Sequence, residues 1–237
     1  MKWSMASIWQ RLRGTAAAGT IDRVLTELTR SQSRVRFLQI GSNDADHGDP
    51  LRRYILAGRW EGTMVEPVPY VFERLMAKYG QIKHLNLLNC AVDDKPGTRE
   101  FYYVAESDDE LPAWYDQLGS FLIENILKHR EYIPDIQTRI RTIHVPCVSV
   151  AALLEKGADV VQSDVEGYDD VMVSAVLDTP IRPQVIIYEH IHLGTKKGDA
   201  IDERLAGCGY IQLKDGQNTI AVRSDCKLLL RELTITR

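Results

Sequence analysis

The sequence contains few cysteines, and no two of them are close neighbours. The four are widely spaced, and no pair is separated by only two residues (Cys90, Cys147, Cys208 and Cys226). Metal sites built from cysteine normally use such closely spaced pairs, so a cysteine-ligated metal is not expected here. The spacing instead predicts reduced, structural thiols in a cytoplasmic protein.

The chain also lacks the patterns that would direct it to a membrane or to nucleic acid. No apolar run approaches the roughly 20 residues that span a bilayer. The first residues lack the continuous apolar segment of a secretory signal. A net charge of −4 gives no electrostatic reason to expect a nucleic-acid partner. Together with a hydrophobic content of 44%, these absences predict a soluble globular protein without an integral membrane span.

Two apolar segments end in polar residues that suit a nucleoside. The first covers residues 35–40 and stops at the sequence Gly-Ser-Asn-Asp, residues 41–44. The second covers residues 62–66 and ends at Glu66. A glycine turn lets a ligand approach the backbone, and a carboxylate at the next strand end accepts hydrogen bonds from ribose hydroxyls. The pattern therefore predicts a site for an adenosine-type cofactor.

Apolar strands alternate with helical patterns along most of the chain. Strands are expected at residues 35–40, 62–66, 84–91, 99–104, 160–165 and 185–188. Helices are expected at residues 20–30, 50–57, 69–79, 150–156, 169–177 and 200–208. Two last strands, 210–213 and 218–223, flank Asp215-Gly216, a strong hairpin signal. The alternation predicts an α/β fold with helices on both faces of a mostly parallel sheet and a terminal antiparallel hairpin.

A helical extension is expected before the main domain, which covers residues 35–237. The extension covers residues 1–34, with one helix at about 4–13 and a second that begins at an N-cap, Thr20. The N-terminal segment is rich in arginine, and a solvated surface, an anionic substrate, a membrane surface and a partner protein all remain open as its role.

An insertion at about 105–141 interrupts the main domain. It is acidic at 106–110, contains Trp114, Tyr115 and Phe121, and is expected to be helical from 120 to 129. Insertions of this kind tend to lie over the crevice at the carboxyl ends of the strands, so a lid that selects the substrate is expected. A surface excursion packed on its own aromatic residues, or a contact in a homo-oligomer, remains open.

With these motifs placed, the chain resembles the FkbM family of S-adenosylmethionine-dependent methyltransferases. The resemblance covers residues 35–222 and is carried by Gly-Ser-Asn-Asp at 41–44, Val-Glu-Pro at 65–67, Asp-Val-Glu-Gly at 164–167, and residues 90–94. The chain departs from the family pattern in three places. Gln162 and Ser163 stand before Asp164, where the family often has a lysine. Gln39 replaces the usual acid before the glycine loop, and Ala45 replaces its second glycine. Alanine is the mildest replacement there if its φ is negative.

The resemblance implies a Rossmann-like class I methyltransferase with a seven-stranded sheet, and an activity. The expected reaction is O-methylation of a small-molecule or sugar hydroxyl, with S-adenosylmethionine as cofactor and S-adenosylhomocysteine as product. An N-methyltransferase, and a noncatalytic protein that retains the fold as a binding module, remain as alternatives. A nicotinamide-dependent enzyme would continue with further strand-helix units instead of the hairpin.

Residues at the ends of the first four strands are expected to bind the cofactor. The glycine turn approaches the methionine part, and Asp44 is expected to accept from its ammonium group. Glu66 is expected to bind the ribose, and residues 89–91 the adenine. The full predicted set is Gly41, Ser42, Asn43, Asp44, Glu66, Pro67, Asn89, Cys90, Ala91 and Asp164.

Three residues are predicted to be catalytic. Methyl transfer to a hydroxyl requires alignment of the oxygen, exclusion of water and removal of one proton. A histidine suits the last task, so His190 is predicted to be the general base, with His192 and Asp164 as competitors. Asp164 and Glu166 are predicted to orient the cofactor or the acceptor.

A magnesium ion is a further hypothesis. Asp164 and Glu189 end two neighbouring strands and offer hard oxygen ligands, with Asp169 as an additional donor. A second cluster of oxygen and nitrogen ligands lies at residues 46–49. The leading prediction remains a site without a metal.

Overall fold

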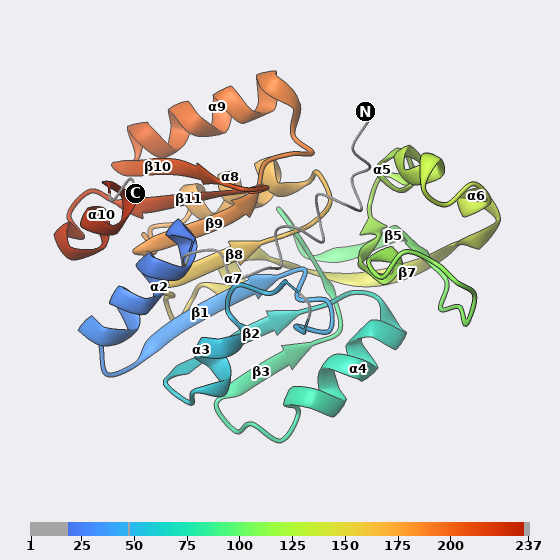
Figure 1. Cartoon of the computed structure of the whole chain (residues 1–237), viewed down its shortest axis with the longest axis horizontal. Helices are drawn as coiled ribbons and strands as arrows, with labels where there is room; N and C mark the ends of the chain where they lie inside the picture. The colour runs from blue at the N-terminus through green and yellow to red at the C-terminus, as the bar shows by residue number, and fades with distance from the viewer. Residues whose placement is uncertain (1–18, 47, 235–237) are drawn as a thin grey trace, which may run out of the picture.

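The architecture was obtained as a computed structural model that describes residues 19–46 and 48–234. The helix expected at about 4–13 lies outside the described residues. Seven strands form the main sheet in the order β10-β11-β9-β8-β1-β2-β3 (Figure 1). Their bounds are Val35–Ile40 (β1), Trp60–Val65 (β2), Leu85–Leu88 (β3), Val160–Ser163 (β8), Val185–Glu189 (β9), Tyr210–Asp215 (β10) and Asn218–Arg223 (β11).

The main sheet is parallel except for β11. Strands β3, β2, β1, β8 and β9 run parallel, whereas β11 pairs antiparallel with both β9 and β10. The expectation of a mostly parallel sheet with a terminal hairpin is confirmed. Connections leave β1 in opposite directions along the sheet, towards β2 and, later, β8. The crevice beside the carboxyl ends of β1 and β8 is therefore the place where such folds bind ligands.

Helices cover both faces of this sheet, because the side chains along each strand point alternately into two apolar cores. Phe37 packs on one side with helices α2 (Thr20–Ser31), α3 (Arg52–Leu56), α4 (Pro69–Tyr79) and α10 (Lys227–Thr234). Leu38 packs on the other side with α7 (Val150–Leu153), α8 (Asp169–Asp178) and α9 (Gly194–Gly207). Each fully buried leucine contributes about 1.5–3 kcal/mol, so both cores hold the strand ends firmly in register.

A second sheet of four strands stands beside the main one. Its order is β4-β7-β5-β6, with bounds Ala91–Asp93, Ile140–Ser149, Gly97–Val104 and Gly119–Ser120 in that order. The single strand expected at 84–91 is therefore wrong, because it divides between β3 and β4. The chain leaves the main sheet at Asn89, a residue type that strands disfavour.

Strand β7 begins inside the segment expected to be an insertion. No strand was expected between residues 104 and 160, yet β7 forms there and continues through Pro146. Strand β4 pairs only with Cys147–Ser149, so β7 has a free edge at Pro146. A strand tolerates proline at an edge, where no ladder hydrogen bond is lost on that side.

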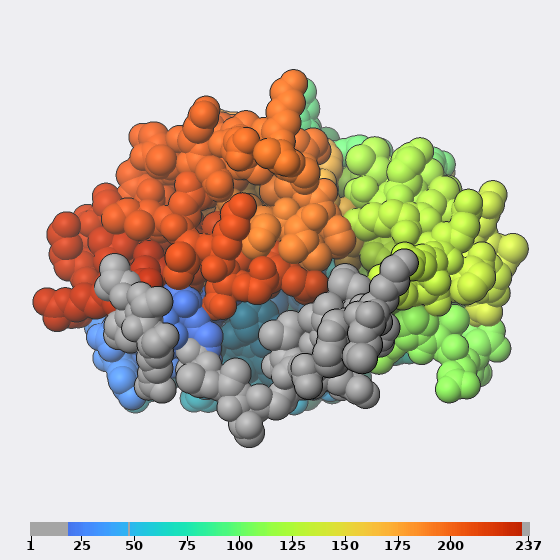
Figure 2. All heavy atoms as spheres, turned by 45° about the horizontal axis from the view of Figure 1, so that its top comes forward, coloured from blue at the N-terminus to red at the C-terminus, as the bar shows by residue number. Residues whose placement is uncertain are grey.

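The rest of the insertion forms a small lobe beside the C-terminal half of the protein (Figure 2). The helix expected at 120–129 is wrong as one element: the lobe contains η1 (Tyr115–Gln117), α5 (Ile123–Leu127), η2 (Lys128–Glu131) and α6 (Ile136–Arg139). It has an apolar core of its own, which includes Leu118, Ile126 and Ile136. The lobe is thus held together internally and is joined to the main domain through β5 and β7.

Two helix starts differ from expectation, and one helix was not expected. Helix α2 begins at Thr20 itself, with Gly19 as N-cap, and the Asp215 carboxylate accepts from the amide of Ile21 at 2.9 Å. Helix α9 begins at Gly194 and not at residue 200, because its first turns are polar and show no apolar periodicity. Helix α10 was not expected, and it packs against α2.

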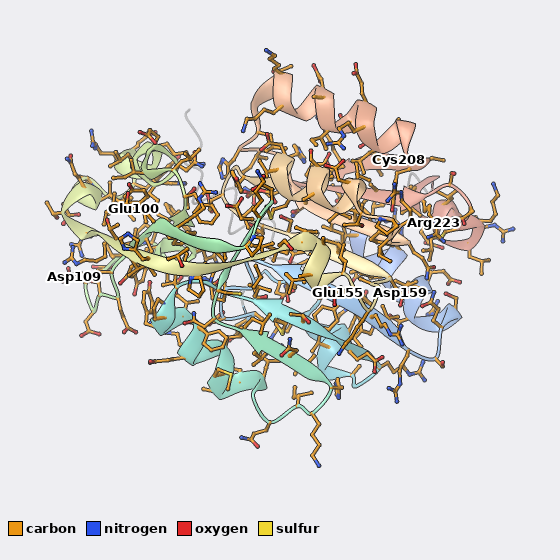
Figure 3. All side chains as sticks on the ribbon, turned by 180° about the vertical axis from the view of Figure 1, so that it is seen from behind. Glu100, Asp109, Glu155, Asp159, Cys208 and Arg223 are labelled. Carbon is orange, nitrogen blue, oxygen red and sulfur yellow. The ribbon has the colours of Figure 1, made fainter. Side chains whose placement is uncertain are left out.

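The two ends of the parallel strands face opposite sides of the molecule. Asp159, which precedes β8, lies far from the insertion, which Asp109 marks in the reverse view (Figure 3). Only the carboxyl ends of the strands therefore face the lobe. Among the described residues, no helix combines the length and the apolar character needed to cross a membrane.

Candidate active site

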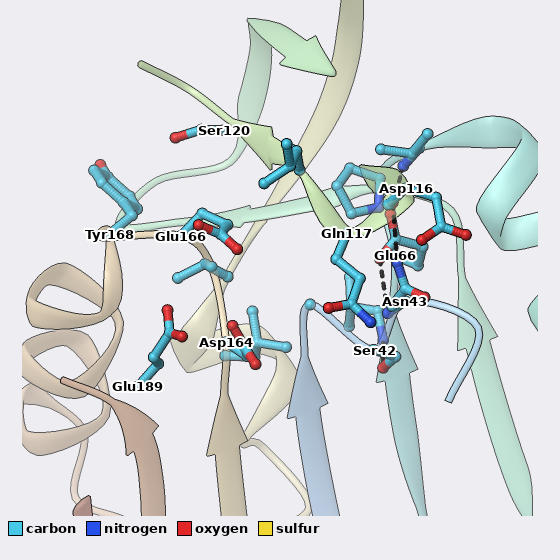
Figure 4. A pocket seen from close by; sticks show the side chains of 18 of the residues that line it. Ser42, Asn43, Glu66, Asp116, Gln117, Ser120, Asp164, Glu166, Tyr168 and Glu189 are labelled. Carbon is cyan, nitrogen blue, oxygen red and sulfur yellow. Dashed lines mark hydrogen bonds between the residues drawn. The ribbon is translucent and has the colours of Figure 1, made fainter. Parts of the chain in front are cut away.

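A cavity of about 340 Å³ lies where the carboxyl ends of β1, β2, β8 and β9 meet the insertion. The strand ends form its floor, and the lobe forms its roof (Figure 4). Its lining includes, from the main domain, Gln39, Gly41, Ser42, Asn43, Glu66, Pro67, Cys90, Ala91, Gln162, Asp164, Glu166, Tyr168, Glu189 and His192. From the insertion it includes Trp114, Asp116, Gln117, Ser120, Phe121, His129 and Tyr132.

The turn after β1 brings the backbone of Gly41 against that of Asp164. Gly41 has φ +73°, and a Cβ added to it would lie 1.9 Å from the Asp164 carbonyl oxygen. Ser42 stabilises the turn: its Oγ donates to the Gln39 carbonyl at 3.3 Å and accepts from the Val65 amide at 3.1 Å. The Ser42 side chain is buried, so it shapes the turn more than it presents a hydroxyl to the cavity.

Glu66 connects the two strand-end loops. Its carboxylate accepts from the amides of Asn43 at 2.9 Å and Val68 at 2.8 Å, and its exposed fraction is 5%. Burial raises the pKa of Glu66 to about 7, although both amide hydrogen bonds oppose the shift. The carboxylate has four lone-pair positions, so two remain for donors from the cavity. Asn43 also reaches the insertion, where Nδ2 donates to the Asp116 carbonyl at 3.1 Å.

Asp44 does not line the cavity. Its carboxylate accepts from Lys78 Nζ at 2.7 Å, an interaction that turns the side chain towards α4. The structure therefore gives no support to Asp44 as a ligand for an ammonium group. The next residue, Ala45, has φ +51°, so the condition of a negative φ is not met. The buried Tyr79 hydroxyl donates to the Ala45 carbonyl at 2.6 Å and helps to hold this strained conformation.

The residues after β3 divide between two roles. Cys90 and Ala91 line the cavity, as expected. Asn89 does not: its Nδ2 donates to the carbonyls of Glu66 at 2.9 Å and Pro67 at 3.2 Å, and thus braces the neighbouring loop. Burial raises the pKa of Cys90 to about 11, so this thiol stays neutral near pH 7.

Three carboxylates converge at the other end of the cavity (Figure 4). Asp164, Glu166 and Glu189 each place one oxygen so that all three lie within 4.8 Å of one another. Asp164 is open to the cavity, which the protein encloses, so removal from bulk water raises its pKa, and the charges of Asp169 and Glu166 add to the shift. Burial, together with Asp164 and Glu166, raises the pKa of Glu189 to about 10. This end of the cavity is therefore built to hold protons or a positive charge.

Glu166 occupies a strained turn held by the insertion. Its φ is +52°, in the left-handed region that side chains disfavour, and Gly167 follows with φ +90°. Asn125 Nδ2, from α5, donates to the Glu166 carbonyl at 2.6 Å. Asp164 and Glu166 therefore do not lie along one extended strand, because the chain turns between them. Burial would raise the pKa of Glu166, but the neighbouring His129 and the charge of His192 lower it overall.

The structure brings His192 and not His190 to the cavity. His190 lies outside the lining, with Nδ1 3.2 Å from Thr219 Oγ1 of β11. His192 lines the cavity, with Nε2 3.4 Å from Glu166 Oε2 and 3.6 Å from Glu189 Oε2. The structure does not bear out His190 as the base: Glu189 faces the cavity and His190 does not, and the turn at residues 190–193 brings His192 back to the lining.

Aromatic residues of the insertion and Tyr168 form a wall of the cavity. Trp114 and Phe121 line it as expected, whereas the hydroxyl of Tyr115 bonds to the backbone of Ser107 inside the lobe. Tyr132 and His129 were not identified from the sequence, and both lie in the lining. Trp114 contacts the rings of both, with centroids 5.8 Å and 5.2 Å away.

The other acidic positions considered from the sequence are occupied by protein contacts. Asp169 is fully buried, and its Oδ1 accepts from Ser163 Oγ at 2.6 Å. Asp46 pairs with Arg52 at 3.1 Å and with Lys78 at 2.8 Å. Asp49 accepts from the Leu51 amide at 2.6 Å. The cluster expected at 46–49 therefore stabilises the loop, and its member at position 47 lies outside the described residues.

The strand order and the position of the cavity define a class I methyltransferase fold. The sequence model of the methyltransferase FkbM domain matches residues 39–211. The chain belongs to this family of S-adenosylmethionine-dependent methyltransferases, which confirms the resemblance drawn from its motifs.

Solved structures of other methyltransferases are similar to this chain. Methyltransferase FkbM from Methylobacillus flagellatus KT matches with a TM-score of 0.51 at 10% identity, over 80% of this chain and 44% of that one. Precorrin-6y C5,15-methyltransferase from Geobacter metallireducens GS-15 gives a TM-score of 0.43 at 12% identity, over 86% and 87%. This chain thus spans less than half of the first of these proteins. No protein with a curated description matches it.

Proposed function

We propose that the protein transfers a methyl group from S-adenosylmethionine to a hydroxyl of a small molecule or sugar. The observation that carries this proposal is that one cavity contains both a place for the cofactor and a place for the acceptor. Glu66 and the Gly41 turn lie at one end, and His192 with its carboxylates lies at the other. When bound, the cofactor supplies a methyl group activated by a positively charged sulfur.

The described residues fit this cofactor. Gln39 and Gln162 are buried, line the cavity, and each has a side-chain oxygen without a hydrogen-bond partner. Two acceptors left in this state cost free energy unless a ligand donates to them. The ammonium group of the cofactor is a suitable donor. Glu66 has positions left for ribose hydroxyls, and the small side chain of Ala91 leaves room for the adenine.

His192 is proposed to remove the proton from the acceptor hydroxyl. Burial lowers the pKa of His192, although the charge of Glu166 opposes this shift. The imidazole is therefore neutral near pH 7 and able to accept a proton. Asp164 and Glu166 are proposed to orient the acceptor, and the insertion is proposed to be the lid that selects it.

Calorimetric titration with S-adenosylhomocysteine tests the cofactor half of the proposal. The wild type is expected to bind, and Glu66→Gln is expected to bind about 10- to 100-fold more weakly, the value of one charge-assisted hydrogen bond. Glu61→Gln is the matched control, since Glu61 lies on β2, which leads to Glu66, and pairs with Arg34 and Arg36 at the far end of that strand. Absence of binding by the wild type would instead favour the noncatalytic module.

The affinity for S-adenosylhomocysteine is expected to increase with pH. The pKa of Glu66 in the free protein is raised to about 7, so the carboxyl is largely protonated at pH 6. Ribose hydroxyls donate best to the ionised form, so binding releases a proton, and the affinity should rise about tenfold from pH 6 to pH 8. Calorimetry at both pH values checks this. A flat profile in the wild type would show that Glu66 is already ionised, whereas Glu66→Gln should lose the dependence.

A further inference from the structure

The cluster of Asp164, Glu166 and Glu189 lacks enough positive charge around it. Within residues 19–46 and 48–234, which the structure describes, no group forms a hydrogen bond or an ion pair with the Asp164 carboxylate. Glu189 is 7% exposed, and its Oε2 has no hydrogen-bond partner. The same holds for Glu166 Oε2.

The basic side chains nearby are concentrated on one member of the cluster. Lys128 Nζ lies 3.7 Å and His129 Nε2 3.9 Å from Glu166 Oε2. His192 Nε2 lies 3.4 Å from that same oxygen and 3.6 Å from Glu189 Oε2. Lys128 thus compensates Glu166, whereas no lysine or arginine among the described residues forms an ion pair with Asp164 or Glu189. Asp164 is exposed to the cavity and Glu189 is buried, and two carboxylates this close favour a shared proton or a cation between them.

We propose that Asp164, Glu166 and Glu189 form a binding site for one divalent cation, Mg²⁺ or Mn²⁺. The donors are three carboxylate oxygens: Asp164 and Glu166 supply two from the turn that follows β8, and Glu189 supplies one from the end of β9. Hard oxygen ligands of this kind select those ions. The distances among the oxygens, all under 4.8 Å, suit a single ion that contacts each of them. Glu189 points most directly to a ligand, because its side chain is buried and its Oε2 has no hydrogen-bond partner.

The role of this cation rests on the proposed function, because the ion would act on the hydroxyl that accepts the methyl group. A hydroxyl that contacts a divalent cation loses its proton more readily. His192, beside the cluster and outside the three-oxygen set, remains placed to receive that proton. The acceptor oxygen would then be fixed by the ion and not by a side chain alone.

Binding of Mn²⁺ to the whole apo protein tests the site directly, with the free-ion signal in electron paramagnetic resonance as the readout. One saturable Mn²⁺ per chain is expected, displaced by excess Mg²⁺. Glu189→Gln is expected to weaken binding at least about tenfold, because it removes the negative charge of a ligand. Glu203→Gln, an exposed glutamate on α9, is the matched control and should bind like the wild type.

Two further measurements keep the outcomes distinct. Asp164→Asn repeats the test at a second ligand, in case Glu189→Gln does not fold. Titration of the same samples with S-adenosylhomocysteine reports on the cofactor half separately. No saturable Mn²⁺ in a wild type that binds S-adenosylhomocysteine would overturn the cation site and leave the proposed function standing. Mn²⁺ binding unaffected by both substitutions would place the ion elsewhere and also overturn the site.

Discussion

Gly41→Ala is expected to destabilise the protein severely and to abolish cofactor binding. The added methyl group would lie 1.9 Å from the Asp164 carbonyl oxygen, at a φ of +73°. Both atoms belong to strand ends that are fixed by the sheet, so neither can move aside without separating β1 from β8. The free energy of unfolding should fall by at least about 4 kcal/mol, as measured by urea denaturation.

Gly157→Ala is the matched control for that substitution. Gly157 has a similar φ, +75°, but a Cβ there would meet nothing within 4 Å. It should therefore cost only the conformational penalty, about 1–2 kcal/mol. Equal losses in the two variants would mean that the close approach at Gly41 does not constrain the molecule.

His192→Asn is expected to reduce kcat by about 10² to 10⁴, the usual contribution of a general base. Affinity for S-adenosylhomocysteine should be unchanged, because His192 lies beside Glu166 and Glu189, which are at the opposite end of the cavity from Glu66 (Figure 4). The measurement is transfer of a labelled methyl group to an acceptor found by screening. In the wild type the rate should fall as pH drops below the pKa of His192, which burial lowers from its usual value.

His190→Asn controls for the loss of a neighbouring histidine. His190 contacts Thr219 outside the cavity, so this variant should keep its turnover. If His192→Asn also keeps full turnover while binding the cofactor, the reaction needs no base. That result would favour a nitrogen acceptor, whose lone pair attacks without prior loss of a proton.

Local signals predicted the main sheet well. Proline at the first position and a glycine after the last residue mark helix α4, and the structure has it at Pro69–Tyr79 as expected. Asp215-Gly216 marks the hairpin that closes the sheet. The second sheet had no such signal, because β7 pairs with β5 across an insertion and runs through Pro146. Pairings of that range depend on tertiary structure and not on local pattern.

The site followed the same division. Glu66, Asp164 and Glu189 lie at the carboxyl ends of strands, so the topology alone predicted that all three line the same crevice. His129 comes from the insertion, and no periodicity relates its position to that of Glu166. The choice between His190 and His192 depended on the turn after β9, where the alternation of side chains along a strand no longer applies.

The bond from Asn125 to the Glu166 carbonyl limits how the insertion of this protein can be exchanged for another. A loop that only covered a pocket could be exchanged for another to obtain a new substrate range. Exchange of this segment would also remove two hydrogen bonds to the main domain. One runs from Asn125 to the carbonyl of Glu166, which has a left-handed conformation, and the other from Asn43 to the Asp116 carbonyl. A chimera must therefore preserve both anchor points, so that acceptor range and catalytic geometry are inherited together.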